Sequence, residues 1–508
     1  MTGPTASLSG FGRLLRAEWV KLRSVRRWAI AMAAMVVLSV GLGLLTSASS
    51  RTDANEHQFF SIGPDGLSVV DQFQFVHQTL AGDGSIQARV VSQHPSHAWA
   101  GAGVMFKDGT RSGSAYGALM LTPGHGVRLG ANFTTDVAGP AVSGPRWLKL
   151  TRTGQNLTGY ESTDGVTWRR VGTVTVRQLP AGAEVGLFVS SPEKLTIERT
   201  AGGTSVMGTS TTGQAVFDSV SVAPAGGGTT VGSVVGSWRS DAVHREFTEE
   251  EIGPPPPPGS VPPGKPIGPG GGSFTEVDGV FTVSGTGAIR REEAPDDLTQ
   301  ATLFGILVGL PALVAVAVLF VTSEYRRGMI RTTFAATPQR GRVLAAKAIV
   351  LGGVAFALGL VASVTAFAIG QPMMRSRGFA PPAFAMVSLS QVNVVRALVG
   401  SAAFVALVAV LGLALGAILR RSAGAITAVI ALVILPTFVA VALPTTAARW
   451  LLWLTPAGGF AVQRAKPPTQ ELAEPWSMIN PWVGIGTVTA YAAVALTLAI
   501  VLVRRRDA

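Results

Sequence analysis

The sequence predicts an α-helical membrane protein with six transmembrane helices and an extracytoplasmic all-β sandwich domain between helices 1 and 2. Two observations predict this fold class. The 508-residue chain is 47% hydrophobic and only 14% charged, with a mean hydropathy of +0.39. Its apolar residues gather in six long runs without ionisable side chains, whereas a polar stretch rich in Gly, Pro, Ser and Thr fills residues 47–300. The chain therefore combines a membrane part with a β-rich insert.

Each apolar run is long enough to cross a bilayer, which takes about 20 apolar residues in a helix. The runs cover residues 28–47, 301–322, 348–369, 397–419, 422–443 and 482–503. The first run exceeds the apolar core of a secretory signal, about 7 to 15 residues, so we expect it to be retained. The glycine pairs Gly305/Gly309 and Gly412/Gly416 would let helices approach closely.

Basic residues predict the orientation, because Lys and Arg are enriched in short cytoplasmic segments. They cluster before the first run, between the second and third, between the fourth and fifth, and after the sixth. Six crossings put these four segments on one side. We therefore expect a multi-pass plasma-membrane protein with cytoplasmic N and C termini and an extracellular β domain. This topology also accounts for the net charge of +12 without a nucleic-acid partner.

The sequence lacks its own energy source for transport. Ion-coupled carriers place ionisable groups within their membrane spans, and the six runs have none. No phosphate-loop motif is present, and the one Gly-Lys pair, Gly264-Lys265, lies in a proline-rich segment. The chain has no cysteine, which excludes disulfides and thiol chemistry. The chain is expected not to be an enzyme on its own and to need no cofactor, with ATP bound by a separate subunit.

Residues 1–27 predict an N-terminal amphipathic helix at the cytoplasmic membrane surface. Apolar residues such as Leu14, Leu15 and Leu22 share one arc, and arginines lie largely opposite. Glu18 falls in the middle of the apolar arc. Either it pairs with a nearby arginine and has no role in transport, or it bonds a cytoplasmic loop or a partner.

Three cytoplasmic segments resemble a known family. They read EWVKLRS at 18–24, SEYRRG at 323–328 followed by Ala336, Thr337 and Pro338, and LGAILRRSAGA at 415–425. In this order and at these membrane boundaries, they are similar to permease subunits of type-2 ABC export transporters from high-GC Gram-positive bacteria. The first external loop, usually short in that family, here holds a domain.

The resemblance implies a six-helix half-transporter that works with an ABC ATP-binding subunit and a second permease copy, as a homodimer or heterodimer. It also implies a cytoplasmic coupling loop at 323–347 and a re-entrant or interfacial segment at 450–463. The residues that we expect to couple to the ATPase are Glu18, Glu324, Arg326, Arg327, Arg331, Phe334 and Arg340. Glu324 would pair with Arg327, with Arg331 or with a basic residue of the N-terminal helix.

Residues 69–224 predict an antiparallel β-sandwich from short alternating segments bounded by Gly, Asp and Pro. The expected strands cover 73–78, 85–92, 101–106, 116–121, 147–152, 157–162, 167–171, 185–190 and 215–222. A Pro/Gly-rich linker at 249–273 and a return segment at 274–300 would lead back to the membrane. Whether the return segment pairs with the sandwich is open.

Four segments of this region resemble concanavalin-A-like (laminin-G-like) sandwiches, many of which bind glycans. They read RWLKLTR at 146–152, YESTDGVTW at 160–168, VGLFV at 185–189 and FDSV at 217–220. No carboxylate pair suited to glycoside hydrolysis is evident, and Trp147 and Trp168 are expected in the core. The histidines His77, His94 and His97 show no metal-ligand spacing.

Two functions from different classes follow. The first is the permease subunit of an ATP-driven exporter that moves an unknown amphiphilic substrate across the plasma membrane, because uncharged apolar walls suit a lipid or an amphiphilic drug. The alternative is a membrane-anchored envelope-binding or sensor protein that uses the sandwich to bind cell-wall glycan. Six helices with a patterned cytoplasmic loop favour the permease, because a sensor needs only one or two anchors.

Overall fold

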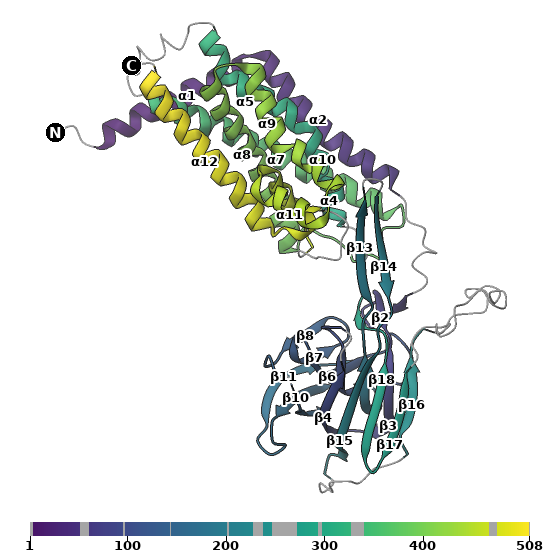
Figure 1. The fold of residues 1–508 in the computed structure, drawn as a ribbon. Coiled ribbons are helices and arrows are strands. Elements are labelled where there is room, and N and C mark those ends of the chain that lie inside the picture. The colour runs from purple at the N-terminus through teal and green to yellow at the C-terminus, as the bar shows by residue number, and fades with distance from the viewer. Residues whose placement is uncertain are drawn as a thin grey trace.

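The computed structural model describes residues 4–50, 60–94, 97–142, 144–200, 203–226, 237–245, 272–292, 297–326, 340–466 and 475–506. The chain forms a long helical bundle and a β domain that lie end to end (Figure 1). Both termini lie at the end of the bundle far from the β domain, which is called the terminal end below. The opposite end is called the domain end.

Six helices among the described residues are long and apolar enough to cross a membrane, as the sequence predicts. They are α2 (Arg26–Ser49), α4 with α5 (Leu298–Leu303 and Ile306–Arg326), α7 (Arg340–Arg375), α8 (Val392–Leu419), α9 with α10 (Ser422–Val433 and Leu435–Ala442) and α12 (Pro481–Arg506). Pro436 stands in the first turn of α10, where it explains the break after α9. Helices α7 and α8 begin well before their predicted runs, at Arg340 and Val392, so α7 includes Lys347 and α8 includes Arg396.

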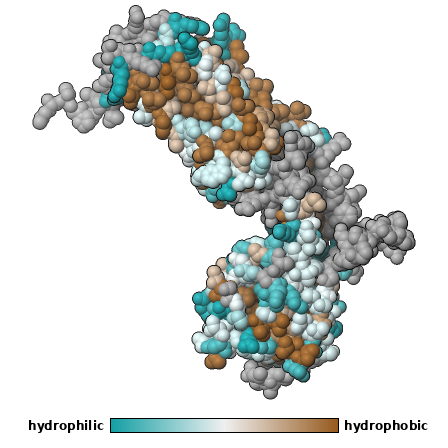
Figure 2. Space-filling view, in the orientation of Figure 1, coloured by the Kyte–Doolittle hydropathy of each residue, from teal (hydrophilic) through white to brown (hydrophobic). Residues whose placement is uncertain are grey.

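Small residues bring the helices close together. A Cβ added to Gly305, just before α5, or to Gly309 of α5 would overlap Ser39 of α2. On α8, a Cβ on Gly412 would lie 3.3 Å from Ala317 Cβ, and one on Gly416 would lie 2.9 Å from Val321 Cγ1. The close contacts predicted from both glycine pairs are confirmed. Figure 2 shows hydrophobic residues over the middle of the bundle and hydrophilic residues at its terminal end, the distribution expected of a membrane protein.

The segment before α12 turns back into the bundle at the domain end. It contains α11 (Thr445–Leu454) and the 3-10 helix η2 (Pro456–Gln463). Every residue of η2 is buried. Gly459 packs on the ring of Phe404, and Gly458 and Gly484 meet through their backbones. The predicted segment 450–463 falls within these two helices. Three exposed tryptophans, Trp450, Trp453 and Trp482, lie near this end, as in an interfacial aromatic belt.

The β domain contains two seven-stranded antiparallel sheets. The first has the order β11 (Arg169–Thr175), β10 (Asn156–Ser162), β9 (Arg146–Thr153), β4 (Gly84–His94), β15 (Gly213–Pro224), β18 (Val280–Gly285) and β17 (Ser273–Val277). The second has the order β16 (Arg239–Val243), β3 (Phe73–Ala81), β12 (Gly182–Ser190), β5 (Gly101–Lys107), β6 (Tyr116–Thr122), β7 (Gly126–Ala131) and β8 (Thr135–Ala138). Each of the predicted strands coincides with or overlaps one of these.

The predicted domain boundary at 69–224 is too narrow. Strands β1 (Ser61–Ile62) and β2 (Ser68–Asp71) precede or straddle its start, and β2 pairs with β19 (Ile289–Arg291). After residue 224, β16 pairs with β3 and β18 pairs with β15. Phe281 and Val283 of β18 are buried in the core, so the return segment belongs to the sandwich. Most of the predicted linker 249–273 lies outside the described residues.

One hairpin leaves the sandwich. Strands β13 (Lys194–Thr200) and β14 (Gly203–Thr209) pair with each other in a two-stranded sheet of their own. Figure 1 shows this hairpin reaching from the β domain toward the domain end of the bundle. It was not predicted from the sequence.

Candidate functional site

The N-terminal helix α1 (Pro4–Ser24) packs against the bundle at the terminal end. Leu22 is buried in the bundle core, and Leu14 and Leu15 are half-buried, whereas Arg13, Arg16 and Arg23 are exposed. This is the amphipathic pattern that the sequence predicts. Glu18 is only 1% exposed, so the middle of the apolar arc contacts other parts of the protein. A buried carboxylate needs partners that offset its loss of hydration.

Glu18 and Glu324 share a buried lysine. The Nζ of Lys347, on α7, lies 2.6 Å from Glu18 Oε2 and 2.8 Å from Glu324 Oε1, at the end of α5. Lys21 donates to the same two carboxylates at 2.8 and 3.2 Å. We call Glu18, Lys21, Glu324 and Lys347 the terminal ion cluster. It joins α1, α5 and α7 through two acids and two lysines.

The positive and negative charges of the terminal ion cluster are equal in number. Lys347 also lies 4.4 Å from the ring centroid of Phe320, a cation–π contact that favours a buried ammonium group. For Lys21, partial burial lowers the pKa, but hydrogen bonds and charge from Glu18 and Glu324 outweigh it, and the pKa is raised. Removing Glu18 or Lys347, which are both buried, would leave a net buried charge, which costs about 3 to 5 kcal/mol.

The structure brings together only part of the predicted coupling residues. Glu18 and Glu324 meet, and the predicted bond between Glu324 and a basic residue of the N-terminal helix is confirmed by Lys21. Arg326 is exposed at the end of α5, and Arg340 is half-buried at the start of α7. Arg327, Arg331 and Phe334 lie outside the described residues.

Lys347 was not predicted as a site residue. In the sequence it is the last basic residue of the predicted coupling loop, and it follows four uncharged residues, from Val343 to Ala346. One signal could have identified it. The lysine lies one turn inside an apolar segment, and two acids lie at similar distances from the membrane boundary on the segments predicted to be its neighbours.

A second polar contact joins two segments at the domain end of the bundle. The Oδ1 of Asp297 caps α4 by accepting the backbone N–H groups of Thr299 and Gln300, both at 3.1 Å. Its Oδ2 accepts the N–H groups of Ala465 and Lys466, at 2.8 and 2.9 Å. One carboxylate thus ties the start of α4 to the segment after η2.

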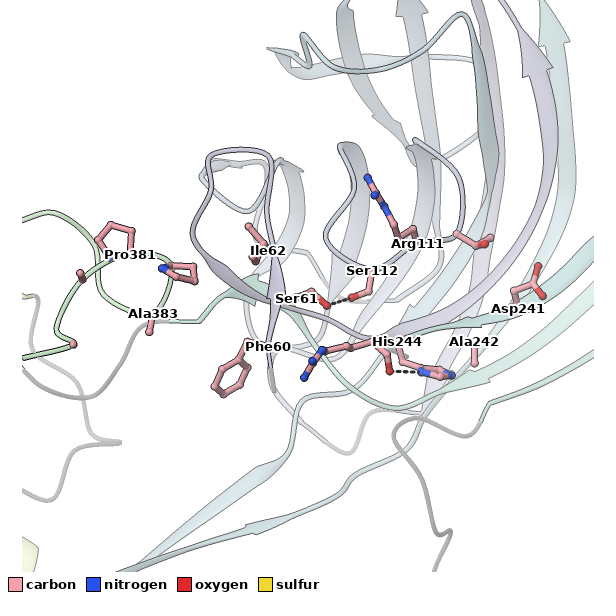
Figure 3. Close-up of a pocket in the computed structure, with 15 residues that line it drawn as sticks. Phe60, Ser61, Ile62, Arg111, Ser112, Asp241, Ala242, His244, Pro381 and Ala383 are labelled. Carbon is pink, nitrogen blue, oxygen red and sulfur yellow. Dashed lines mark hydrogen bonds between the residues drawn. The ribbon is translucent and has the colours of Figure 1, made fainter. Parts of the chain in front are cut away.

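The β domain also contacts the bundle away from its chain connections. Ser68 N donates to Pro382 O, at 2.8 Å, in the loop between α7 and α8. Beside this bond lies a cleft of about 1070 Å³ between the loop and the domain. Figure 3 shows Pro381 and Ala383 on one side of the cleft and Phe60 and Asp241 on the β domain.

His77 joins two carboxylates within the β domain. Its Nδ1 lies 2.6 Å from Glu184 Oε2, and its Nε2 lies 2.8 Å from Asp241 Oδ2. The carboxylates flank opposite edges of the ring, so they do not converge on one point as metal ligands would. In the described part of the chain, no group of three or more His, Asp or Glu residues could hold a metal ion. The arrangement fastens edge strand β16 to the sheet.

Comparisons with known proteins give little beyond partial structural likeness. No protein-family model and no curated protein matches the chain, and 21 solved chains match part of it. The GH43 protein BlXynB from Bacillus licheniformis is 21% identical, covering 21% of this chain and 24% of its own, with a TM-score of 0.18. The chain thus spans about a quarter of that protein's length.

Two further structures have similarly low scores. A functionally unknown protein from Saccharomyces cerevisiae is 16% identical, covering 22% of this chain and 62% of its own, with a TM-score of 0.17. Scytalido-glutamic peptidase is 9% identical, covering 42% of this chain and 98% of its own, with a TM-score of 0.24. With TM-scores this low, none of these similarities carries an argument about activity.

Proposed function

We propose that this chain is the membrane-spanning permease subunit of an ATP-driven exporter, with the terminal end of the bundle in the cytoplasm and the β domain outside. The observation that carries the proposal is the terminal ion cluster. It fastens an amphipathic helix, α1, to α5 and α7 on either side of the segment 327–339. A partner protein that displaced this segment would therefore move α1, α5 and α7 together.

The proposal assigns the energy source to a separate ATP-binding subunit, because this sequence has no phosphate-loop motif. Positive charge supports the orientation: the segments at the terminal end include Arg23, Arg326, Arg342, Arg420 and Arg505. The substrate is proposed to be amphiphilic, since the bundle core around Leu313, Val408 and Val429 is apolar. A second permease copy would complete the pathway.

The competing class is a membrane-anchored sensor that transports nothing. The two classes separate by whether a separate phosphate-loop ATPase hydrolyses ATP faster when it is assembled with this chain. We would coexpress the two proteins, reconstitute them in lipid vesicles and measure ATP hydrolysis with and without the permease. The proposal predicts that hydrolysis by the assembled complex exceeds that of the ATPase alone, and that a fluorescent amphiphile moves across the vesicle membrane only with ATP. Unchanged hydrolysis and no movement would support the sensor.

A further inference from the structure

A lysine and an aspartate are buried against each other inside the β domain. Asp71 is the last residue of β2, and Lys107 is the last residue of β5. The Nζ of Lys107 lies 2.7 Å from Oδ2 of Asp71, and both side chains are 0% exposed. The Nζ also lies 5.8 Å from the ring centroids of Phe73 and Tyr116. The two groups are therefore in direct contact, beside aromatic rings and away from water.

An ion pair leaves one atom of this site without a hydrogen bond. Oδ2 of Asp71 accepts the backbone N–H of Gly113 at 2.8 Å, and Nζ of Lys107 donates to the backbone O of Ser114 at 3.3 Å. Oδ1 of Asp71 is buried and has no hydrogen-bond partner among the described residues. Because a buried charged group without hydrogen bonds is costly, an unsatisfied carboxylate oxygen needs an explanation.

An amide between the two side chains would satisfy every polar atom of the site. Such an amide has one oxygen and one N–H group. The oxygen accepts the N–H of Gly113, the amide N–H donates to the O of Ser114, and the unsatisfied Oδ1 is lost as water. The backbone groups around the pair thus match the hydrogen-bonding needs of an amide better than those of a carboxylate beside an ammonium group.

We propose that Lys107 and Asp71 form an intramolecular isopeptide bond. Nζ attacks Cγ, so that an N–C bond forms and one C–O bond of the carboxyl group breaks. Of the three ammonium protons, one stays on the amide nitrogen and two leave with the oxygen as water. The reaction involves no oxidation or reduction. It replaces two buried charges by a neutral amide, which removes the cost of keeping charges away from water.

The geometry of the site supplies what the reaction needs. Attack requires an uncharged amine, and the hydrogen bond between Nζ and Oδ2 lets a proton pass from Lys107 to Asp71. The fixed contact also replaces a chance encounter, and well-oriented groups reach effective concentrations of about 10⁵ M or more. The N–H of Gly113 polarises the carboxyl group in the manner of an oxyanion hole. Since water is excluded, the amide is protected from hydrolysis.

The isopeptide bond would fasten the membrane-connected part of the β domain to its sandwich. Strand β2 pairs with β1 and β19, and these two strands follow α2 and precede α4 in the chain. Strand β5 belongs to the second seven-stranded sheet. The sequence has no cysteine, so a disulfide cannot make this link. The bond goes beyond the proposed transport function and is independent of it, because both residues belong to the β domain.

Mass spectrometry of the purified full-length protein tests the bond. The wild type should be lighter than its sequence by one water molecule. Trypsin should fail to cut after Lys107 and should release a branched peptide that joins residues 52–89 to residues 90–111. Lys107→Arg keeps the positive charge but removes the nucleophilic amine, so it should have the full mass. The matched control is Lys149→Arg, beside the half-buried Trp168 on the other sheet, which should keep the branched peptide.

A wild type of full mass that trypsin cuts normally after Lys107 would overturn the inference and leave an ion pair only. Water can also be lost when an Asp-Gly pair such as Asp164-Gly165 closes to a succinimide, but that reaction gives no branched peptide. Loss of water without the branched peptide would therefore overturn the inference as well. Because the wild type provides the deciding measurement, the result does not depend on whether Lys107→Arg folds.

Discussion

Lys347 Nζ lies 2.6 Å from Glu18 Oε2, although 329 positions separate the two residues in the chain. Both side chains are at most 2% exposed. The pair brings the N-terminal helix to the first turns of α7, and Glu324 adds the end of α5. The terminal ion cluster thus joins the N-terminal helix to the ends of α5 and α7, which lie far from it in the sequence.

Removing the shared lysine tests whether the terminal ion cluster stabilises this unit. Lys347→Ala leaves two buried carboxylates, Glu18 and Glu324, with only the partly exposed Lys21 between them. We expect the free energy of unfolding to fall by about 3 to 5 kcal/mol, because one buried charge then has no partner of its own. Thermal unfolding in nanodiscs measures the change. The matched control is Arg342→Ala, on the same helix but exposed, which should change stability little. Equal stabilities for the two variants would show that the cluster contributes nothing.

Cysteine labelling tests the orientation, and the absence of natural cysteines removes background labelling. Thr163→Cys lies on the β domain, and Arg342→Cys lies at the terminal end; both native side chains are exposed. A membrane-impermeant maleimide should label Thr163→Cys in intact cells and Arg342→Cys only after permeabilisation. Labelling of Arg342→Cys in intact cells would contradict the proposed topology.

The β domain should be removable as a unit. The Oγ1 of Thr46, near the end of α2, donates to Ala301 O of α4 at 3.3 Å, so a short Gly/Ser linker can replace residues 51–296. We expect the shortened protein to insert and to bind its ATPase. A deletion ending at Ser273 would instead separate β17 and β18 from β15 and should aggregate. Loss of the ATPase from the correctly shortened protein would assign the domain a role in assembly.

Acid should loosen the edge strand β16. Burial raises the pKa of Glu184, but hydrogen bonds from His77 and Thr79 and charge from His77 and Arg239 outweigh it, so the pKa is lowered from 4.5. A lowered carboxylate pKa contributes stability that is present above the unfolded value and lost as the pH falls through the folded value.

We therefore expect protection of β16 amides from hydrogen exchange, corrected for intrinsic rates, to fall only below pH 4.5. Glu184→Gln should show reduced protection already at neutral pH and a smaller dependence on acid. Protection that is unchanged by acid in the wild type would contradict this assignment.

Periodicity and hydropathy predicted the helices and most strands because those signals are local. They predicted neither the hairpin β13–β14 nor the pairing of β18 with β15, because pairing across a long linker depends on tertiary packing around Phe281. For the site, Glu18 stood out because a carboxylate in an apolar arc needs a partner. Its partner, Lys347, could not be chosen from sequence alone, since many basic residues lie at the same end of the bundle.

We propose above all that the terminal end binds a separate ATP-binding subunit through the segment between α5 and α7. Copurification of that subunit with this chain, at equal membrane levels of each variant, tests the proposal most directly. We expect the subunit to be recovered with the wild type, and we expect Phe334→Ala to weaken its binding by about 2 to 4 kcal/mol, because an apolar anchor of this loop is lost. Failure to recover the subunit with the wild type would contradict the claim, and equal recovery with Phe334→Ala would exclude Phe334 as the anchor.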